Sequence, residues 1–125
     1  MINVYHSETA ADFDKESRLN KYMARSSDVI LNLLQTGQIF LRKVATLKDT
    51  NDLDDAYCLT NSIESGWYQN HGIEAHLSGA KSLRSTSVGD VIEKDGVFHV
   101  VCAMGFETLD ATVALNHIQN EATPA

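Results

Sequence analysis

The spacing of apolar residues predicts a strand, a helix and a second strand early in the chain. Apolar and polar residues alternate from Ile2 to His6, as in a strand with one buried face. One helical face carries Val29, Ile30, Leu33 and Leu34, and the N-cap signal Ser26-Ser27-Asp28 precedes them. Gly37 is placed to end this helix. Residues 39–44 then favour another strand.

The middle of the chain combines one helical pattern with segments of weak or irregular spacing. Apolar residues from Leu53 to Ile63 recur at helical spacing, which predicts a second helix ending before Gly66. Residues 66–83 show no regular period and indicate an irregular connection. Residues 7–25 are polar, with weak helical spacing, and are typical of either a helix or an ordered loop.

The pair Asp95-Gly96 predicts a β-hairpin. Two-residue hairpin turns need positive φ angles, which Asp-Gly adopts at low cost, and β-branched and aromatic residues flank the pair on both sides. Gly105 indicates a strand end or a bulge. Residues 110–120 then favour a terminal helix, followed by a loose end at residues 123–125.

Together these elements predict an α+β class in one small domain over residues 1–125. About three helices are expected to pack on a small mixed or antiparallel sheet that includes the C-terminal β-hairpin. Residues 1–50 supply the N-terminal strand and helices, and residues 109–125 the C-terminal helix and tail.

The acidic composition favours some classes of binding partner and argues against others. The chain has 125 residues, a net charge of −7 and a pI near 5.0, which argues against binding nucleic acid by phosphate neutralisation and suits a basic partner. We find neither a signal-peptide pattern nor an apolar run of membrane-spanning length. We therefore expect a cytoplasmic protein with no membrane partner. Cys58 and Cys102 are expected to be reduced thiols in the core.

The loop Arg84-Ser85-Thr86-Ser87 is the first candidate site. One guanidinium and three hydroxyls beside the turn at Gly89-Asp90 are groups that hold a phosphate or a carboxylate. This pattern supports a small-ligand binder, such as a nucleotide sponge in which Trp67 or Tyr68 stacks on a base. The alternative is structural: the hydroxyls satisfy a turn, and Arg84 pairs with Asp90 or another acid.

Two other features suit a protein partner. Trp67 and Tyr68 lie in the irregular connection, where an aromatic pair either binds a partner or fills the core under a loop. The second feature is an acidic run at the start of the second predicted helix. It either forms a solvated helix start or a surface that docks a basic groove. This acidic partner surface comprises Asp49, Asp52, Asp54 and Asp55.

The chain offers weak signals for metal binding and catalysis. Its five histidines and two cysteines lack the spacing of a zinc site, so no metal or other cofactor is predicted. Neither Ser85 nor Ser87 lies in a nucleophile elbow. An enzyme would have to use Cys102 or His99, and a thiol buried in a strand is usually inert. We therefore assign no catalytic residue and predict a protein that is not an enzyme.

Residues 53–106 carry a family resemblance. The run Arg84-Ser85-Thr86-Ser87-Val88-Gly89-Asp90-Val91, followed by the hairpin and by Gly105-Phe106, resembles the YodL-like domain of small phage and plasmid proteins. Matching positions include Asn61 and Trp67. The resemblance implies a mobile-element setting and a role in countering host defences. It implies no catalytic set, and it covers less than half of the chain.

The leading hypothesis is a small acidic accessory protein of a phage or mobile element that binds and modulates a host macromolecule, most simply a host protein. The alternative is a small phosphate-bearing ligand held by the Arg84–Ser87 loop, in a pocket that a homo-oligomer can also build between chains. A divergent enzyme using cysteine and histidine is the second alternative. The predicted binding residues are Asn61, Trp67, Tyr68, Arg84, Ser85, Thr86, Ser87 and Asp90.

Overall fold

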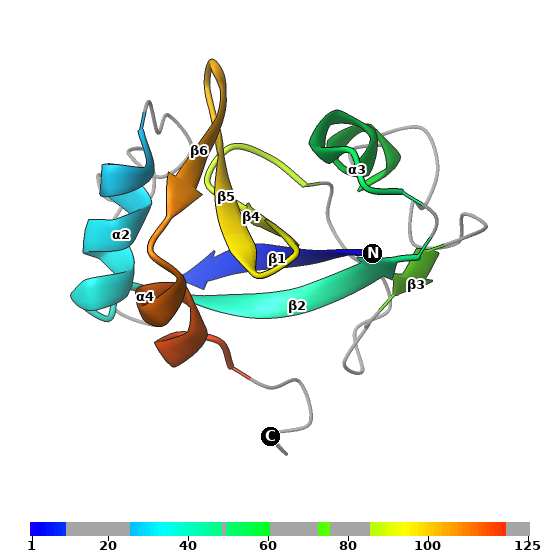
Figure 1. The fold of residues 1–125 in the computed structure, drawn as a ribbon. Helices are drawn as coiled ribbons and strands as arrows, with labels where there is room; N and C mark the ends of the chain where they lie inside the picture. The colour runs from blue at the N-terminus through cyan, green and yellow to red at the C-terminus, as the bar shows by residue number, and fades with distance from the viewer. Residues whose placement is uncertain (10–25, 49, 61–72, 76–85, 120–125) are drawn as a thin grey trace.

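The structure, a computed structural model, describes residues 1–9, 26–48, 50–60, 73–75 and 86–119. Its elements in chain order are β1 (Ile2–Thr9), α2 (Ser27–Gln35), β2 (Ile39–Leu47), α3 (Leu53–Thr60), β3 (Ile73–Ala75), β4 (Val91–Lys94), β5 (Val97–Cys102), β6 (Gly105–Leu109) and α4 (Ala111–Asn116). Strands β1 and β2 run through the middle of the molecule, with α2 and α4 toward one end and α3 toward the other (Figure 1).

The strands form one six-stranded sheet in the order β3-β2-β1-β4-β5-β6, and every neighbouring pair is antiparallel. Strand β1 lies inside the sheet. On one side it pairs with β2, and on the other with β4, where Ile2 faces Lys94 and Tyr5 faces Val91. The first strand of the chain is therefore held by a partner far along the sequence.

The expected fold of about three helices packed on a small sheet is wrong: the described residues are roughly α+β in class, but the sheet is their larger part. An antiparallel sheet dominates the described residues, and the helices there are short, with 9 residues in α2, 8 in α3 and 6 in α4. Two strands have no clear pattern in the sequence. Strand β3 has only 3 residues and lies within the segment predicted to be irregular. Strand β6 begins at Gly105 and buries only Leu109, so it shows no alternation of apolar and polar residues.

Several local predictions are confirmed. Asp95 and Gly96 have φ values of 52° and 83°, as the turn of a two-residue hairpin requires, and they connect β4 to β5. Helix α2 begins after Ser26, and Gly37 follows its end with a φ of 74°. The terminal helix is also present as α4, where the Asp110 side chain accepts a hydrogen bond from the backbone N–H of Val113. These signals are all local, which explains why the sequence reveals them.

The sheet separates two hydrophobic clusters. Adjacent residues of one strand point to opposite faces. Val91 and Val100 accordingly join the cluster that contains the buried face of α2, whereas Ile92 and Val101 join the cluster that contains Ala56 of α3. Helices α2 and α4 thus cover one face, and α3 covers part of the other. Among the described residues, no helix has both the length and the apolar character needed to cross a membrane.

Buried and exposed valines on β5 provide a matched test of this core. Val100 is fully buried, whereas Val97 is 45% exposed. We expect Val100→Ala to lower the free energy of unfolding by about 2 kcal/mol, because it removes two buried carbons and leaves a cavity. Val97→Ala should change it by less than about 0.5 kcal/mol. Urea denaturation of both variants measures the difference, and equal effects would contradict the assigned faces of β5.

Candidate functional site

The structure describes part of each site predicted from the sequence. Thr86, Ser87 and Asp90 of the hydroxyl-rich loop are described, as are three acids of the acidic run. Outside the described residues lie Asn61, Trp67, Tyr68, Arg84, Ser85 and Asp49. The predictions for those six residues therefore stay predictions.

The hydroxyl-rich loop packs against the end of β1 and forms a buried polar group with it, here called the β1–loop cluster. It comprises His6 and Ser7 from β1 and Thr86, Ser87 and Asp90 from the loop before β4. His6, Ser7, Thr86 and Asp90 are each at most 1% exposed. Buried polar groups are costly unless they are hydrogen-bonded, so the contacts within this cluster decide whether it is stable.

The carboxylate of Asp90 is the centre of the cluster. Its Oδ1 accepts a hydrogen bond from the backbone N–H of Ser7 at 2.9 Å, and its Oδ2 accepts one from the backbone N–H of Ser87 at 2.8 Å. The hydroxyl of Ser7 lies 3.3 Å from Oδ1 and donates to the carbonyl of Gly89 at 2.8 Å. Hydrogen bonds to a charged group are stronger than neutral ones, so these contacts offset the cost of burying the carboxylate.

A tight turn places Asp90 in this position. The backbone N–H of Asp90 donates to the carbonyl of Ser87 at 3.0 Å, and Gly89 has a φ of 94°, which favours glycine. Two backbone hydrogen bonds attach the turn to Val101 of β5. The carbonyl of Val101 accepts from the N–H of Gly89, and the N–H of Val101 donates to the carbonyl of Asp90, both at 2.8 Å. The Gly89-Asp90 pair therefore determines the turn before β4.

His6 and Thr86 connect the cluster to α3. The Nε2 atom of His6 lies 2.9 Å from Oγ1 of Thr86, and the backbone N–H of Thr86 donates to the carbonyl of Thr60, the last residue of α3, at 2.8 Å. Asp90 Oδ2 also approaches Nε2 of His6, at 3.9 Å. In a catalytic triad the acid and the nucleophile occupy opposite ring nitrogens, so this arrangement lacks triad geometry.

These contacts favour the structural interpretation of Thr86, Ser87 and Asp90. A phosphate site needs backbone and hydroxyl donors directed at an empty position. Here the N–H groups of Ser7 and Ser87 are directed at the Asp90 carboxylate. A phosphate entering this space would also meet the negative charge of that carboxylate. In the described part of the loop, the Asp90 carboxylate thus already occupies the position that a bound phosphate would need.

The thiol and the imidazole considered for catalysis do not come together. Cys102 and His99 lie three residues apart on β5, so their side chains point to opposite faces of the sheet. Burial and the charge of Glu107 raise the pKa of the Cys102 thiol, which lowers its thiolate fraction at neutral pH. Partial burial and then Lys94 lower the pKa of His99. Among the described residues, no group of three or more His, Cys, Asp or Glu side chains is arranged to hold a metal ion.

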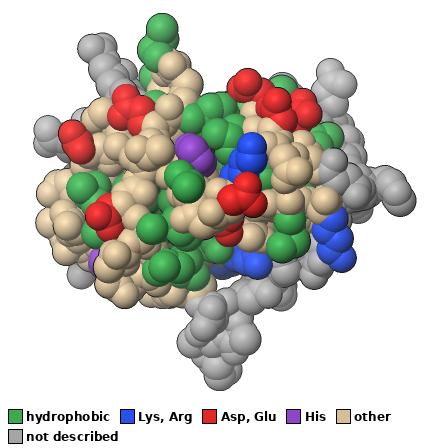
Figure 2. Space-filling model, in the orientation of Figure 1, with side chains coloured by type: hydrophobic (Ala, Val, Ile, Leu, Met, Phe, Trp, Pro, Cys, Tyr) green, Lys and Arg blue, Asp and Glu red, His purple; other side chains and the backbone are tan. Residues whose placement is uncertain are grey.

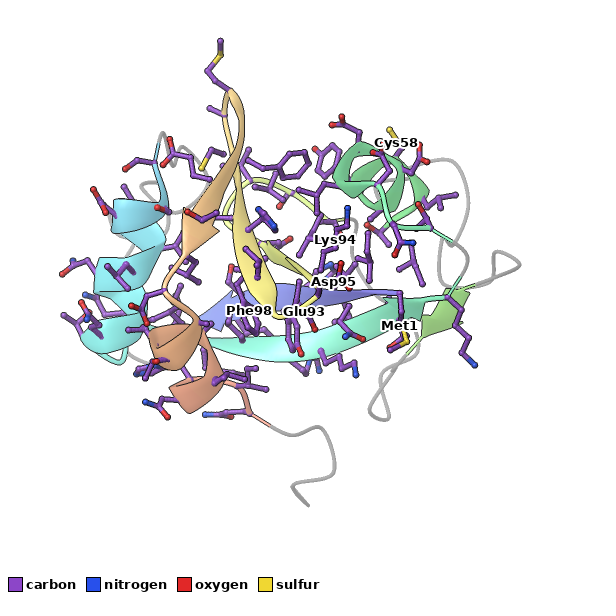
Figure 3. All side chains as sticks on the ribbon, viewed as in Figure 1. Met1, Cys58, Glu93, Lys94, Asp95 and Phe98 are labelled. Carbon is purple, nitrogen blue, oxygen red and sulfur yellow. The ribbon has the colours of Figure 1, made fainter. Side chains whose placement is uncertain are left out.

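Cys58 was expected to be a core thiol, and this prediction is wrong. Cys58 is exposed, and both thiols are free. Figure 3 shows Cys58 on the outer side of α3. Residues Ala56 and Thr60 form the buried side of this short helix, and Cys58 lies between them in sequence, on the side that faces outward.

The acidic run forms the start of α3. Oδ1 of Asp52 accepts hydrogen bonds from the backbone N–H groups of Asp54 and Asp55, at 2.8 and 3.2 Å, so Asp52 caps the helix. All three acids are exposed. Among the described residues, no cation forms an ion pair with Asp54 or Asp55. The run thus divides into one structural acid and two acids that present their charge to solvent.

A pocket beside this run was not evident from the sequence. It has a volume of about 250 Å³ and lies between α3, the turn before β4 and the β5–β6 hairpin. Its lining residues are Asp54, Tyr57, Val88, Val101, Cys102, Ala103, Gly105 and Phe106. In the sequence, Tyr57 is one of the residues at helical spacing between Leu53 and Ile63, and Phe106 lies in β6, which shows no alternation of apolar and polar residues. Only the pairing of β5 with β6 brings the two aromatic residues together.

Comparisons with known proteins give no further guide. No family model, no curated protein and no solved structure matches this chain. The resemblance to the YodL-like domain therefore stays a prediction from the run Ser87-Val88-Gly89-Asp90-Val91 and its neighbours.

The β1–loop cluster predicts a large effect of a small substitution. Asp90→Asn should lower the free energy of unfolding by about 2–4 kcal/mol, because an amide offers only one acceptor oxygen and turns an N–H₂ group toward a backbone N–H. Asp28→Asn, on the exposed first turn of α2, is the matched control and should cost less than about 1 kcal/mol. Thermal and urea unfolding measure both; an Asp90→Asn variant as stable as the control would contradict the cluster's role.

The two cysteines should differ in reactivity. With an aromatic disulfide reagent, native protein should label rapidly at Cys58, which is exposed, and slowly at Cys102, whose thiol is buried and has a raised pKa. The Cys58→Ser variant isolates the slow reaction, and labelling of the protein in denaturant gives the unhindered rate. If Cys102 in the native fold reacted as fast as in denaturant, it would again be a candidate nucleophile.

Proposed function

We propose that this protein is a small acidic accessory protein that binds and modulates a host macromolecule, with a basic surface on a host protein as its target. The feature that carries this proposal is a surface made by α3 and the β5–β6 hairpin. We call it the α3–hairpin surface and define it by Asp54, Asp55, Tyr57, Met104 and Phe106.

The α3–hairpin surface combines exposed charge with exposed apolar area. Met104, in the β5–β6 turn, is 94% exposed, so its flexible apolar side chain is available for contact with a partner. The exposed carboxylates of Asp54 and Asp55 lie on α3, across the pocket from the hairpin. Figure 2 shows acidic side chains over α3 beside a hydrophobic area. An apolar centre with a charged rim is the usual composition of a protein interface.

The biological setting comes from the family resemblance. The YodL-like domain that this chain resembles occurs in phage and plasmid proteins with a role in countering host defences, and binding a host protein is one way to fill that role. The net charge of −7 agrees with a basic partner. The filled state of the β1–loop cluster also favours a protein partner over a phosphate-bearing ligand, because Thr86, Ser87 and Asp90 satisfy each other and β1.

Affinity purification of tagged protein from a bacterial host lysate tests this proposal. The unchanged protein should retain a host protein in stoichiometric amount. A variant with Asp54→Lys, Asp55→Lys and Met104→Ser should retain about tenfold less, because it reverses the charge of the rim and removes the exposed apolar contact. Asp52 is left unchanged because it caps α3.

Leu115→Ser on α4 is the matched control, since Leu115 is also an exposed apolar residue, at 62%, and lies away from α3 (Figure 1). It should retain the partner fully. Trp67→Ala tests separately the aromatic residue that the sequence suggested. Equal retention by the triple variant and by Leu115→Ser, with both folded, would remove the α3–hairpin surface as the binding site.

A further inference from the structure

The pocket within the α3–hairpin surface has an unusual combination of lining groups. Helix α3 supplies Asp54 and Tyr57, and the hairpin supplies Cys102 and Phe106. Its volume of about 250 Å³ is far larger than the roughly 30 Å³ that one water molecule occupies in the liquid. The pocket is thus large enough for a side chain of a partner, and its chemistry indicates which one.

Two aromatic rings form one wall. The centroids of Tyr57 and Phe106 are 6.5 Å apart, and the ring planes meet at 78°, an edge-to-face arrangement. Both residues are half-buried, so each ring is held by the fold and still reaches the pocket. Aromatic faces attract cations, and a planar guanidinium can also stack on them.

The charge of the pocket is negative. Among the described residues that line it, Asp54 is the only charged one, and Asp55 follows it on α3. Glu107 of the hairpin does not add to this charge, because its carboxylate accepts the backbone N–H of Ser27 at the start of α2, on the other face of the sheet. A cation entering beside the rings would therefore meet the carboxylate of Asp54 on α3. An anion would be repelled by the same carboxylate.

We propose that this pocket receives the guanidinium group of an arginine on the basic partner, with Asp54 as its ion-pair acceptor and Tyr57 and Phe106 as its aromatic wall. The inference rests on the proposed function and specifies its partner. Arginine fits better than lysine because its guanidinium is planar, more weakly hydrated and able to donate two parallel hydrogen bonds to one carboxylate.

Nuclear magnetic resonance titration with N-acetyl-arginine amide tests the pocket without any knowledge of the partner. Saturable shifts should appear at the Tyr57 and Phe106 rings and at the Cys102 amide. N-acetyl-citrulline amide, which keeps the shape but lacks the charge, and N-acetyl-lysine amide should both bind more weakly. Asp54→Asn should weaken arginine binding about two- to fivefold, whereas Asp28→Asn, an exposed acid on α2, should leave it unchanged.

Three results would overturn the arginine assignment: shifts located elsewhere or absent, equal binding of citrulline, or equal binding of lysine. The result of this titration does not depend on the result of the affinity purification, so the two proposals can fail separately. If the triple variant loses the host protein but the arginine probe does not bind the unchanged protein, the binding surface is supported and the arginine pocket is wrong. If the probe binds as expected but the same variant keeps its partner, the pocket holds and the proposed function is wrong.

Discussion

The fold depends on the pairing of β1 with β4. Strand β1 lies inside the sheet, and this pairing closes a long loop of chain, since Ile2 faces Lys94 and Tyr5 faces Val91. The regular ladder ends at Tyr5 and Val91. Just beyond it, the Asp90 carboxylate accepts the backbone N–H of Ser7, so a side chain continues the connection where the chain turns away from the strand. Asp90 therefore fixes where the central pairing stops.

The same contacts position the candidate binding surface. The turn that carries Asp90 is joined to β5 through Val101, and Thr86 is joined both to His6 of β1 and to the carbonyl of Thr60 at the end of α3. Helix α3 and the β5–β6 hairpin are thus attached to one buried polar centre. Tyr57 and Phe106 can meet as a ring pair because both of their elements are held at that centre. A rigid support of this kind is what keeps a binding pocket in shape.

The sequence predicts those features of the fold that interactions between neighbouring residues determine. The Asp95-Gly96 turn, the end of α2 at Gly37 and the terminal helix within residues 110–120 depend on a few neighbouring residues, and all three are found. The size of the sheet depends on pairing between distant segments. Its edge strand β3 has only 3 residues, and its other edge strand, β6, shows no alternation of buried and exposed residues. Local patterns carry little information about such strands, so the extent of the sheet was underestimated.

The hydroxyl-rich loop shows why residue types alone do not define a site. Serine, threonine and aspartate beside a glycine turn suit a phosphate, but they equally suit a turn that must bury its own polar groups. Burial decides between the two, because a binding site must leave its donors accessible, whereas Thr86 and Asp90 are fully buried and bonded to β1. Asp54 and Met104 differ from these residues because both are exposed, Asp54 in the lining of the pocket and Met104 in the β5–β6 turn, so their side chains are accessible for contact.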